Sequence, residues 1–275
     1  MNCRGKQLNY GEYTHIMGVL NVTPDSFSDG GAYVNLETAV SHAKTMVADG
    51  ATIIDIGGES SRPGAEPVPA KIELDRVLPV IGALVSEHLD TVISIDTVKA
   101  VVAQQALEAG AHIINDITAL RGDAAMARVA AEMEAGVILM HMKGTPRTMQ
   151  HKPQYQDVVK EIYAELENWI SSAEHKGIDS DRIIIDPGIG FGKTTEQNLH
   201  ILKHLDEFKR LNKPLLIGTS RKSFIGSLLD LPVTERVEGT LSTVCWSITH
   251  GVDIVRVHDV KSTSRAARIT DALYR

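Results

Sequence analysis

The sequence has little of what would place it in a membrane or outside the cell. It contains 2 cysteines in 275 residues, Cys3 and Cys245, which are too few for a disulfide framework and stand in no metal-type cluster. No stretch approaches the roughly 18 apolar residues of a membrane span. The start, MNCRGKQLNYGEYTH, lacks the apolar core of a signal peptide. We therefore expect a cytoplasmic protein that does not bind membranes.

Basic residues are also in short supply. Lys and Arg total 28 against 35 Asp and Glu, which gives a net charge of −7 at pH 7. A general nucleic-acid surface would need a basic excess, so we expect no nucleic-acid partner, and an anionic substrate would need a local cationic pocket. No Pro/Ser-rich linker or low-complexity tract divides the chain, and we expect residues 1–275 to form a single domain.

A repeated pattern of helical stretch, glycine and β-branched run organises the chain. The glycines are Gly50, Gly110, Gly136, Gly177 and Gly251, each predicted to end a helix in the left-handed conformation. Further apolar runs begin at residues 14, 91 and 213, and together these segments give eight strand candidates.

The intervening segments have the periodicity of amphipathic helices. Their apolar residues fall on one helical face, as at Leu36, Ala39, Val40, Ala43, Met46 and Val47, and at Ile162, Leu166, Trp169, Ile170 and Ala173. Eight alternations of a buried strand and a helix predict an α/β fold, the TIM (β/α)8 barrel, for which the length is typical. A doubly wound open sheet is the alternative.

The stretch IIIDPGIGFGKT at residues 183–194 ends like a phosphate-binding P-loop. That motif requires a glycine at the position of Pro187, which has a fixed φ and no N–H to offer a phosphate. The dinucleotide pattern G-x-G-x-x-G is not matched either. We interpret the stretch as a glycine-rich loop between a strand and a helix.

Polar residues follow the predicted strands at their C-terminal ends, where barrels of this kind build their active sites. Acceptors at Asp96, Asn115 and Asp186 suit the N–H edge of a flat nitrogen heterocycle, because a carboxylate can accept two parallel bonds from it. A single such residue is also explained as a helix cap or loop residue. The whole set is Asn21, Asp55, Glu59, Ser61, Arg62, Asp96, Asn115, Asp116, His141, Asp186, Ser220 to Lys222, Arg256 and His258.

Cationic residues form the second part of this set. Arg62, Lys222, Arg256 and His258 come from the second, seventh and eighth strands, and on an acidic protein they indicate a bound anion. The alternative for Lys222 and Arg256 is pairing with the nearby aspartates. Two long loops, NVTPDSFSDGGAYVN and GGESSRPGAEPVPA, combine proline with glycine as expected of lids, although they could also be plain connectors.

These motifs resemble those of the dihydropteroate synthase family along essentially the whole chain, in order. The segments that carry the resemblance are MGVLNVTPDSFSDGG at 17, IIDIGGESSRPGA at 53, SIDT at 94, HIINDI at 112, LMHMKGTPRTMQ at 139, IIIDPGIGFGK at 183, LLIGTSRKSFIG at 215 and RVHDV at 256. The resemblance implies condensation of 6-hydroxymethyl-7,8-dihydropterin pyrophosphate with p-aminobenzoate, which yields 7,8-dihydropteroate and pyrophosphate in folate biosynthesis. It also implies membership of an enzyme class that sulfonamides target, and assembly as a homodimer.

The resemblance also assigns roles to residues. It places the pterin on Asp96, Asn115, Met140, Asp186, Lys222 and Arg256, with Asp96, Asp186, Lys222 and Arg256 expected to be catalytic. Pyrophosphate is expected on Asn21, Arg62, Arg256 and His258, with Mg²⁺ on Asn21 and Asp29. The p-aminobenzoate pocket is expected at Phe27, Ser61, Pro63, Phe191, Lys222 and Ser223. The family usually has threonine where this chain has Ser61, which keeps the hydroxyl but loses a methyl contact with the aminobenzoate.

Three alternatives remain open on the sequence. A related barrel could bind a methyl-folate and pass the methyl group to a corrinoid protein, although such a neutral donor would not need the cations. A Schiff-base aldolase could use Lys222. A non-catalytic barrel could serve as a binding partner, but gaps in the motifs would then be expected.

Overall fold

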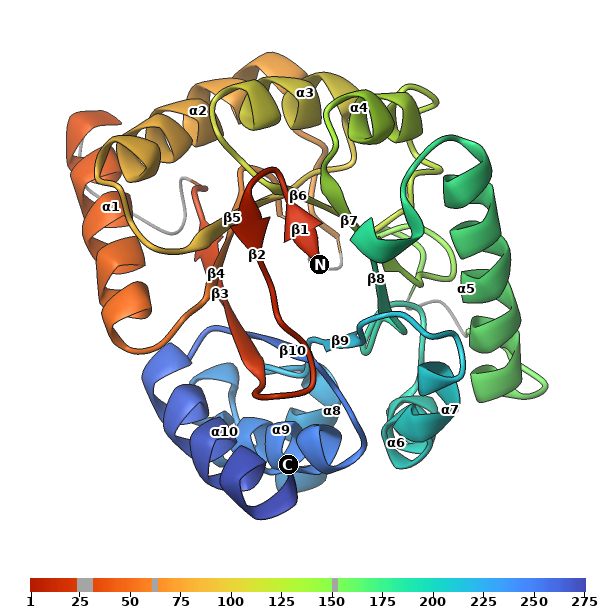
Figure 1. Ribbon diagram of the computed structural model, residues 1–275. Coiled ribbons are helices and arrows are strands. Elements are labelled where there is room, and N and C mark those ends of the chain that lie inside the picture. The colour runs from red at the N-terminus through yellow and green to blue at the C-terminus, as the bar shows by residue number, and fades with distance from the viewer. Residues whose placement is uncertain (24–31, 61–63, 150–152) are drawn as a thin grey trace.

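Eight parallel strands close into a barrel (Figure 1). The computed structural model describes the chain except for residues 24–31, 61–63 and 150–152, and except for the side chains of residues 32–35. The sheet order is β8-β7-β6-β5-β4-β3-β10-β9, and a parallel bridge between Ile185 and Leu215 joins its two ends. The predicted TIM barrel is therefore confirmed, and the alternative of a doubly wound open sheet is wrong. Its strands are β3 (His15–Asn21), β4 (Ile53–Gly57), β5 (Val92–Asp96), β6 (Ile113–Asp116), β7 (Gly136–Met140), β8 (Ile183–Asp186), β9 (Leu216–Ile217) and β10 (Ile254–Val257).

Helices surround the barrel, because each connection between parallel strands must cross on the outside. Cap residues fix some of their boundaries. Thr194 and Gln197, for example, form a reciprocal capping box at the start of α6. The helices are α1 (Ala32–Ala48), α2 (Ala70–Ser86), α3 (Ala100–Glu108), α4 (Met126–Glu132), α5 (Val158–His175), α6 (Thr195–Lys203), α7 (Leu205–Lys209), α8 (Ser223–Leu229), α9 (Val237–Thr249) and α10 (Val260–Tyr274), with short 3-10 turns η2 (Ser180–Arg182) and η3 (Val233–Glu235).

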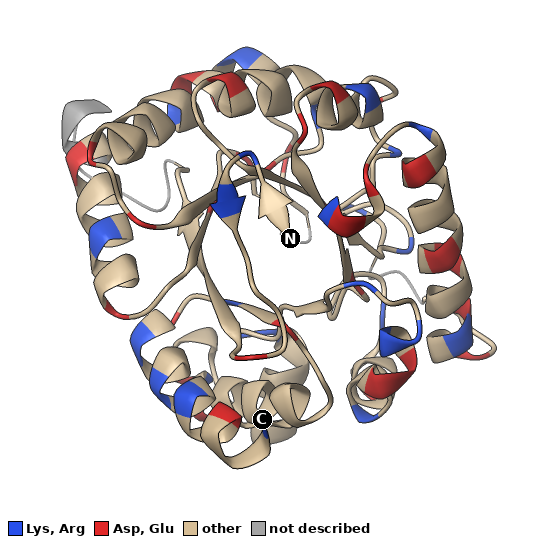
Figure 2. Cartoon of the chain, viewed as in Figure 1, with Lys and Arg blue, Asp and Glu red and all other residues tan. Residues whose placement is uncertain are grey.

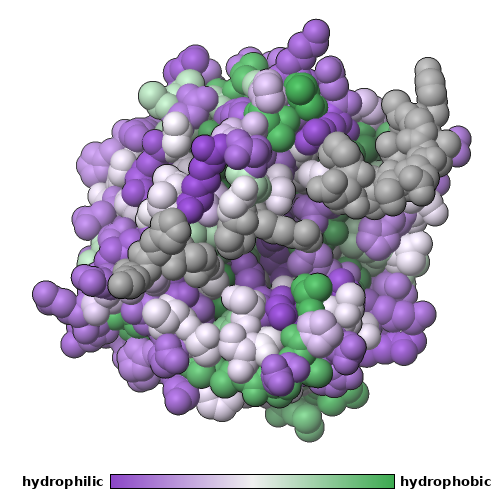
Figure 3. Space-filling view, turned by 180° about the vertical axis from the view of Figure 1, so that it is seen from behind, coloured by the Kyte–Doolittle hydropathy of each residue, from purple (hydrophilic) through white to green (hydrophobic). Residues whose placement is uncertain are grey.

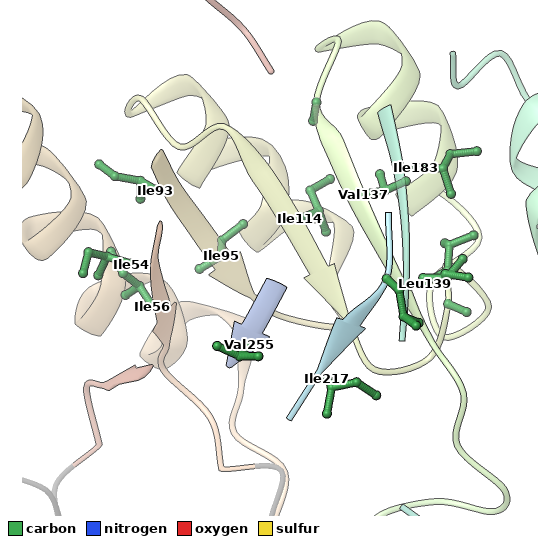
Figure 4. Packing of buried hydrophobic residues seen from close by; sticks show 14 of the residues in the cluster. Ile54, Ile56, Ile93, Ile95, Ile114, Val137, Leu139, Ile183, Ile217 and Val255 are labelled. Carbon is green, nitrogen blue, oxygen red and sulfur yellow. The ribbon is translucent and has the colours of Figure 1, made fainter. Parts of the chain in front are cut away.

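The main core lies between the strands and the helices. Outward-facing residues such as Ile54, Ile56, Ile93 and Ile95 are fully or almost fully buried and point toward the helices (Figure 4). Burial of each such side chain contributes about 1.5–3 kcal/mol. The predicted helical faces meet this layer. They do so through Ala39, Ala43, Met46, Ile162, Leu166, Ile170 and Ala173, which are buried, and through Leu36, Val40, Val47 and Trp169, which are partly buried.

A short N-terminal hairpin closes one end of the barrel, and the sequence did not predict it. Strands β1 (Asn2–Cys3) and β2 (Lys6–Gln7) pair antiparallel and lie across the barrel opening (Figure 1). Cys3 and Leu8 are buried against one residue from the start of each barrel strand, which explains the burial of this cysteine. That layer comprises Met17, Ile53, Val92, Ile113, Ile138, Ile184, Leu216 and Ile254.

Four of the five predicted helix-ending glycines are confirmed. Gly50, Gly110, Gly177 and Gly251 all have positive φ. The prediction was wrong for Gly136, because Glu134 takes the left-handed conformation (φ 53°) and Gly136 is the first residue of β7. A Cβ on Gly136 would lie 2.7 Å from Cε of Met1 and 2.8 Å from Sγ of Cys3. This glycine leaves space for the hairpin.

Charges of both signs are spread over the outer helices (Figure 2). This distribution agrees with the mixed but acidic composition of the chain. In the part of the chain that the structure describes, no helix is both long and apolar enough to cross a membrane.

Candidate active site

The candidate site lies at the C-terminal end of the barrel, opposite the hairpin. Because strand side chains alternate, the residues two positions beyond the apolar layer also face the barrel interior. On five strands that second residue is polar: Asp55, Ser94, Asn115, Asp186 and Arg256. The next step along two of these strands reaches Asp96 and His258. From behind, the face is hollowed at its centre and hydrophilic residues line the hollow (Figure 3).

Arg256 on β10 joins two carboxylates inside the barrel. Its Nε donates to Oδ2 of Asp55 over 2.7 Å, and its Nη2 donates to Oδ2 of Asp96 over 2.7 Å. Burial alone would lower the pKa of Arg256, but Asp55 and Asp96 outweigh it and hold the pKa above the usual value. The pairing of Arg256 with nearby aspartates, an alternative left open by the sequence, thus occurs and fixes its orientation.

Asp55 belongs to the site, although we had not assigned it a role. It is fully buried, and its Oδ2 also accepts a hydrogen bond of 3.0 Å from Nδ2 of Asn115. One carboxylate therefore orients both Arg256 and Asn115, two of the predicted pterin-binding residues. The sequence IIDIG contains a signal for this role. The period of two along a strand places Asp55 on the same face as Ile53 and Gly57, which is the face inside the barrel.

The pKa values of the two predicted catalytic aspartates, Asp96 and Asp186, are raised. Burial raises the pKa of Asp96 to about 7, and the charge of Arg256 opposes this shift. Burial likewise raises the pKa of Asp186 to about 6, opposed by a 2.7 Å hydrogen bond from the Gly188 N–H to its Oδ1. Both carboxyl groups thus change charge close to neutral pH. A ligand that offers N–H donors would favour their ionised forms.

Lys222 is the N-cap residue of α8, and the charges of Asp186 and Asp96 act on it. Burial, followed by the charge of Arg256, lowers its pKa to about 8, and Asp186 and Asp96 oppose this. Its Nζ is 4.1 Å from the centre of the Phe191 ring, a cation–π distance. Ser223, predicted beside it in the aminobenzoate pocket, is the exposed first residue of α8.

His258 is held by Ser220. Nδ1 of His258 lies 3.0 Å from Oγ of Ser220, and the backbone N–H of His258 donates to the same oxygen. Burial and the neighbouring charge of Arg256 lower the pKa of His258 to about 4. The ring is therefore neutral at pH 7 beside these groups, whereas we had counted it among the cations. A bound anion would raise its pKa again.

Asn21, at the end of β3, lies beside the opening above Gly57. A Cβ on Gly57 would lie 3.7 Å from both Oδ1 of Asn21 and Oδ2 of Asp96, so these two oxygens border the same point above Gly57. Hard oxygen donors of this kind suit Mg²⁺, which needs few protein ligands when phosphates supply the others. No cluster of three or more His, Cys, Asp or Glu ligands occurs among the described residues.

An apolar cluster flanks the polar groups on one side. Met140, at the end of β7, packs with Ile117, Met142 and Met149, and Phe191 lies against this cluster. Flexible methionines and an aromatic ring provide a surface for a flat heterocycle. Met140 also pairs in register with Asp186 of β8 and so lies beside the polar set, whereas its contact with a pterin stays a prediction.

The loop after β8 is built differently from a P-loop. Gly188, Gly190 and Gly192 have positive φ, and Lys193 is buried with its Nζ donating to the carbonyls of Gly188 (2.8 Å) and Phe191 (2.9 Å). The lysine therefore points into the loop. Thr194 caps α6. The Walker-like ending thus has a structural explanation, and the interpretation as a strand-to-helix loop is confirmed.

The base of the second long loop is anchored by charge. Lys99 donates to Glu59 and to Oε2 of Glu73, and Glu73 is fully buried. This ties Glu59, two residues after β4, to α2 and to the start of α3. Five predicted site residues lie outside the described residues: Phe27, Asp29, Ser61, Arg62 and Pro63.

Comparisons with known proteins identify the family. The model of the family described as pterin binding enzyme matches residues 17–258. A dihydropteroate synthase of Synechocystis sp. is 52% identical over 268 residues, which cover 97% of this chain and 92% of the relative. The family is therefore established from sequence alone.

Solved structures give the same result. A dihydropteroate synthase from Clostridium difficile, determined in the presence of pteroic acid, has a TM-score of 0.92 and 48% identity, with coverage of 98% of this chain and 100% of that chain. One from Xanthomonas albilineans, with 4-aminobenzoic acid, has a TM-score of 0.92 and 42% identity, with coverage of 98% and 96%. Both the sequence and the fold thus show that the chain belongs to the pterin binding enzyme family, in which it groups with the dihydropteroate synthases.

Proposed function

We propose that the chain condenses 6-hydroxymethyl-7,8-dihydropterin pyrophosphate with p-aminobenzoate to form 7,8-dihydropteroate and pyrophosphate in folate biosynthesis. The observation that carries this proposal is the convergence of Asp96, Asn115 and Asp186 with Arg256 and Lys222 at one end of the barrel. Such a site offers acceptors to a nitrogen heterocycle and cations to the phosphates attached to it. The relatives at about half identity over nearly the full chain carry the same activity in their names.

The pterin fits the acceptor set. Asp186 can accept N–H bonds from the aminopyrimidinone edge, and Asn115 can both accept and donate. Met140 and the guanidinium of Arg256 lie on the same end of the barrel and would flank the ring. Charge-assisted bonds of this type contribute about 1.5–3 kcal/mol each. The carboxylates therefore supply both affinity and orientation.

The pyrophosphate would lie toward β3 and β10. Asn21 ends β3, Arg256 lies near the end of β10 and His258 follows that strand. The two strands pair in register from Ile254 with His15 to Val257 with Gly18. Mg²⁺ would be held by Asn21 and by Asp29, which lies outside the described residues, and when bound it would neutralise part of the charge on the leaving pyrophosphate. Arg62 is a further cation that the resemblance assigns to this anion.

The reaction needs no covalent enzyme nucleophile. Cations stabilise the charge that develops as the C–O bond to pyrophosphate breaks. The positive charge left on the pterin methylene is shared with the ring nitrogens, and the ionised carboxylates of Asp96 and Asp186 stabilise it. The amine of p-aminobenzoate then attacks this carbon and loses a proton. Lys222 and Phe191 would form one wall of the aminobenzoate pocket, with Phe27, Ser61, Pro63 and Ser223 as the remaining predicted contacts.

We also propose a homodimer that forms through the side of the barrel bearing α8, α9 and α10. Leu228 is 56% exposed, Trp246 is 46% exposed and Leu273 is 85% exposed, and these residues lie on the three helices. Apolar surface gathers along the lower edge in Figure 3, where Figure 1 places these helices. Sedimentation of the wild-type protein and of Leu228→Glu tests this. A monomeric wild type would contradict it.

Product analysis tests the proposed activity. The protein is incubated with dihydropterin pyrophosphate, p-aminobenzoate and Mg²⁺, and the mixture is examined by mass spectrometry for 7,8-dihydropteroate. Product that depends on both substrates is expected. Transfer of a methyl group from a methyl-folate, or an imine with Lys222 trapped by borohydride, would instead support one of the alternatives and contradict the proposal.

A further inference from the structure

Lys193 is a buried lysine to which the proposed function gives no role. Only 3% of the residue is exposed. Its Nζ lies 2.8 Å from the Gly188 carbonyl oxygen, 2.9 Å from that of Phe191 and 3.0 Å from Nδ1 of His141. Its three protons are therefore satisfied by neutral acceptors. No hydrogen bond to a carboxylate occurs at Nζ among the described residues, and burial lowers the pKa of Lys193 to about 7, opposed by the charge of Asp186. Burying an ammonium group in this way is unfavourable, so an apolar side chain would serve better for packing alone.

His141 is fixed on its other sides as well. The ring is fully buried and stacks on Trp169 with centroids 5.6 Å apart, and the guanidinium of Arg121 lies 4.1 Å from the Trp169 ring. Burial and the charge of Lys193 lower the pKa of His141 to about 2. The imidazole is therefore neutral. Its Nδ1 accepts from Lys193, and its Nε2 faces Oε2 of Glu165 at 3.6 Å.

The loop that Lys193 holds carries residues of the site. Phe191 lies against Lys222, and a Cβ on Gly190 would be 3.1 Å from Cδ of Lys222. Below them the loop is pressed onto the residues after β7. A Cβ on Gly188 would lie 1.8 Å from the His141 carbonyl oxygen, and one on Gly192 would lie 2.3 Å from that of Lys143.

Two further bonds complete the scaffold. The Gly190 N–H donates to Oδ1 of Asn198 over 2.7 Å, and the Tyr155 hydroxyl donates to the Gly192 carbonyl over 3.0 Å. The loop is thus tied to α6 and to the segment before α5, as well as to its own lysine. Such a scaffold fixes a substrate-facing side chain before any substrate arrives.

We infer that Lys193 is a positioning residue for p-aminobenzoate: by tying the carbonyls of Gly188 and Phe191 to His141, it holds the Phe191 ring against Lys222. The inference rests on the proposed condensation, because it assigns this wall of the pocket to the second substrate. Lys193 itself touches neither substrate. Its effect reaches the reaction through the shape of the loop.

Kinetics of Lys193→Met test the role, because methionine keeps the length of the side chain and loses all three donors. We expect KM for p-aminobenzoate to rise at least tenfold, whereas kcat and the Kd of a pterin analogue without phosphates change less than threefold. Lys160→Met is the matched control, since the Lys160 side chain is 85% exposed and lies on the surface of α5. A folded Lys193→Met protein with unchanged KM would overturn the inference, even if its Tm falls.

Hydrogen exchange of the wild-type protein provides a second test that needs no variant. Without substrates, the amides of Gly188, Gly190 and Phe191 should exchange slowly, because these N–H groups donate to Asp186, Asn198 and the Gly188 carbonyl respectively. Exchange at the rate of an open loop would overturn the inference. Failure of the wild-type protein to form dihydropteroate would refute the proposed function instead, and the exchange result would still report on the loop.

Discussion

The substitution Asp186→Asn tests the pterin site at its most constrained residue. Asp186 is 7% exposed, and its Oδ1 accepts the Gly188 N–H at 2.7 Å. An asparagine would keep its oxygen on this N–H, so its NH₂ group would turn toward the ligand. The pterin edge would then meet a donor where it needs an acceptor.

The expected loss follows from the bonds removed. One charge-assisted hydrogen bond contributes about 1.5–3 kcal/mol, and about 1.4 kcal/mol corresponds to a factor of ten in affinity. We therefore expect the Kd of a pterin analogue without phosphates to rise about tenfold to 150-fold if one bond is lost, and further if both are lost. The fold should survive, because the amide oxygen of the asparagine still accepts the hydrogen bond from the Gly188 N–H.

Calorimetry at pH 7.5 measures this loss under conditions where Asp186 is ionised. Asp90→Asn is the matched control, because it removes a fully exposed carboxylate that pairs with Lys6 at 3.1 Å at the opposite end of the barrel. Its affinity should equal that of the wild type. Unchanged affinity in an Asp186→Asn protein of normal Tm would remove Asp186 from the pterin site.

Three other predictions concern charge and order of binding. The pKa values of Asp186 and Asp96 are raised to about 6 and about 7, so protonation at lower pH removes the acceptors. Pterin affinity should therefore fall at least tenfold from pH 8 to pH 5. A pterin affinity that does not change with pH would refute this. Arg256→Ala should weaken pyrophosphate binding more than the binding of a phosphate-free pterin, and equal losses in calorimetry would assign Arg256 to the ring. Calorimetric titration should show tighter p-aminobenzoate binding once pyrophosphate and Mg²⁺ are present. Ordering a loop costs roughly 1–2 kcal/mol per residue, and p-aminobenzoate would avoid this cost if the first ligand had already met it. Equal affinity in both titrations would indicate a preformed pocket.

The barrel could be predicted because the strands are indicated by local sequence patterns. Gly50, Gly110, Gly177 and Gly251 end their helices with positive φ, and a buried strand follows each one. The period of two along a strand likewise puts Ser94 with Asp96, and Arg256 with His258, on common faces. Strand ends then converge by the geometry of a closed parallel sheet, so the polar set could be gathered without knowing any contact.

The hairpin at the N-terminus could not be predicted in this way. Its strands have two residues each, too short for any periodicity, and they are stabilised by packing on the barrel interior. Gly136 was misinterpreted for the same reason, since the space it leaves is filled by Met1 and Cys3 from the far end of the chain. Contacts at such sequence separation leave no local signal.

Two buried charges were missed for a related reason. Asp55 was seen as one strand end among others, and its link to Arg256 joins residues 201 positions apart. Lys193 was considered only as the end of a phosphate motif, because its backbone acceptors cannot be recognised from residue types. Both side chains act through neighbours, and only their hydrogen bonds reveal it.

Release of pyrophosphate from dihydropterin pyrophosphate, followed with and without p-aminobenzoate, tests the central claim most directly. In the proposed reaction the C–O bond to pyrophosphate breaks before the amine attacks. This order predicts Mg²⁺-dependent release that p-aminobenzoate accelerates, with one dihydropteroate formed for each pyrophosphate released in its presence. Asp186→Asn should lower this rate, and Asp90→Asn should leave it unchanged. A wild-type protein that releases no pyrophosphate with both substrates and Mg²⁺ present would contradict the account.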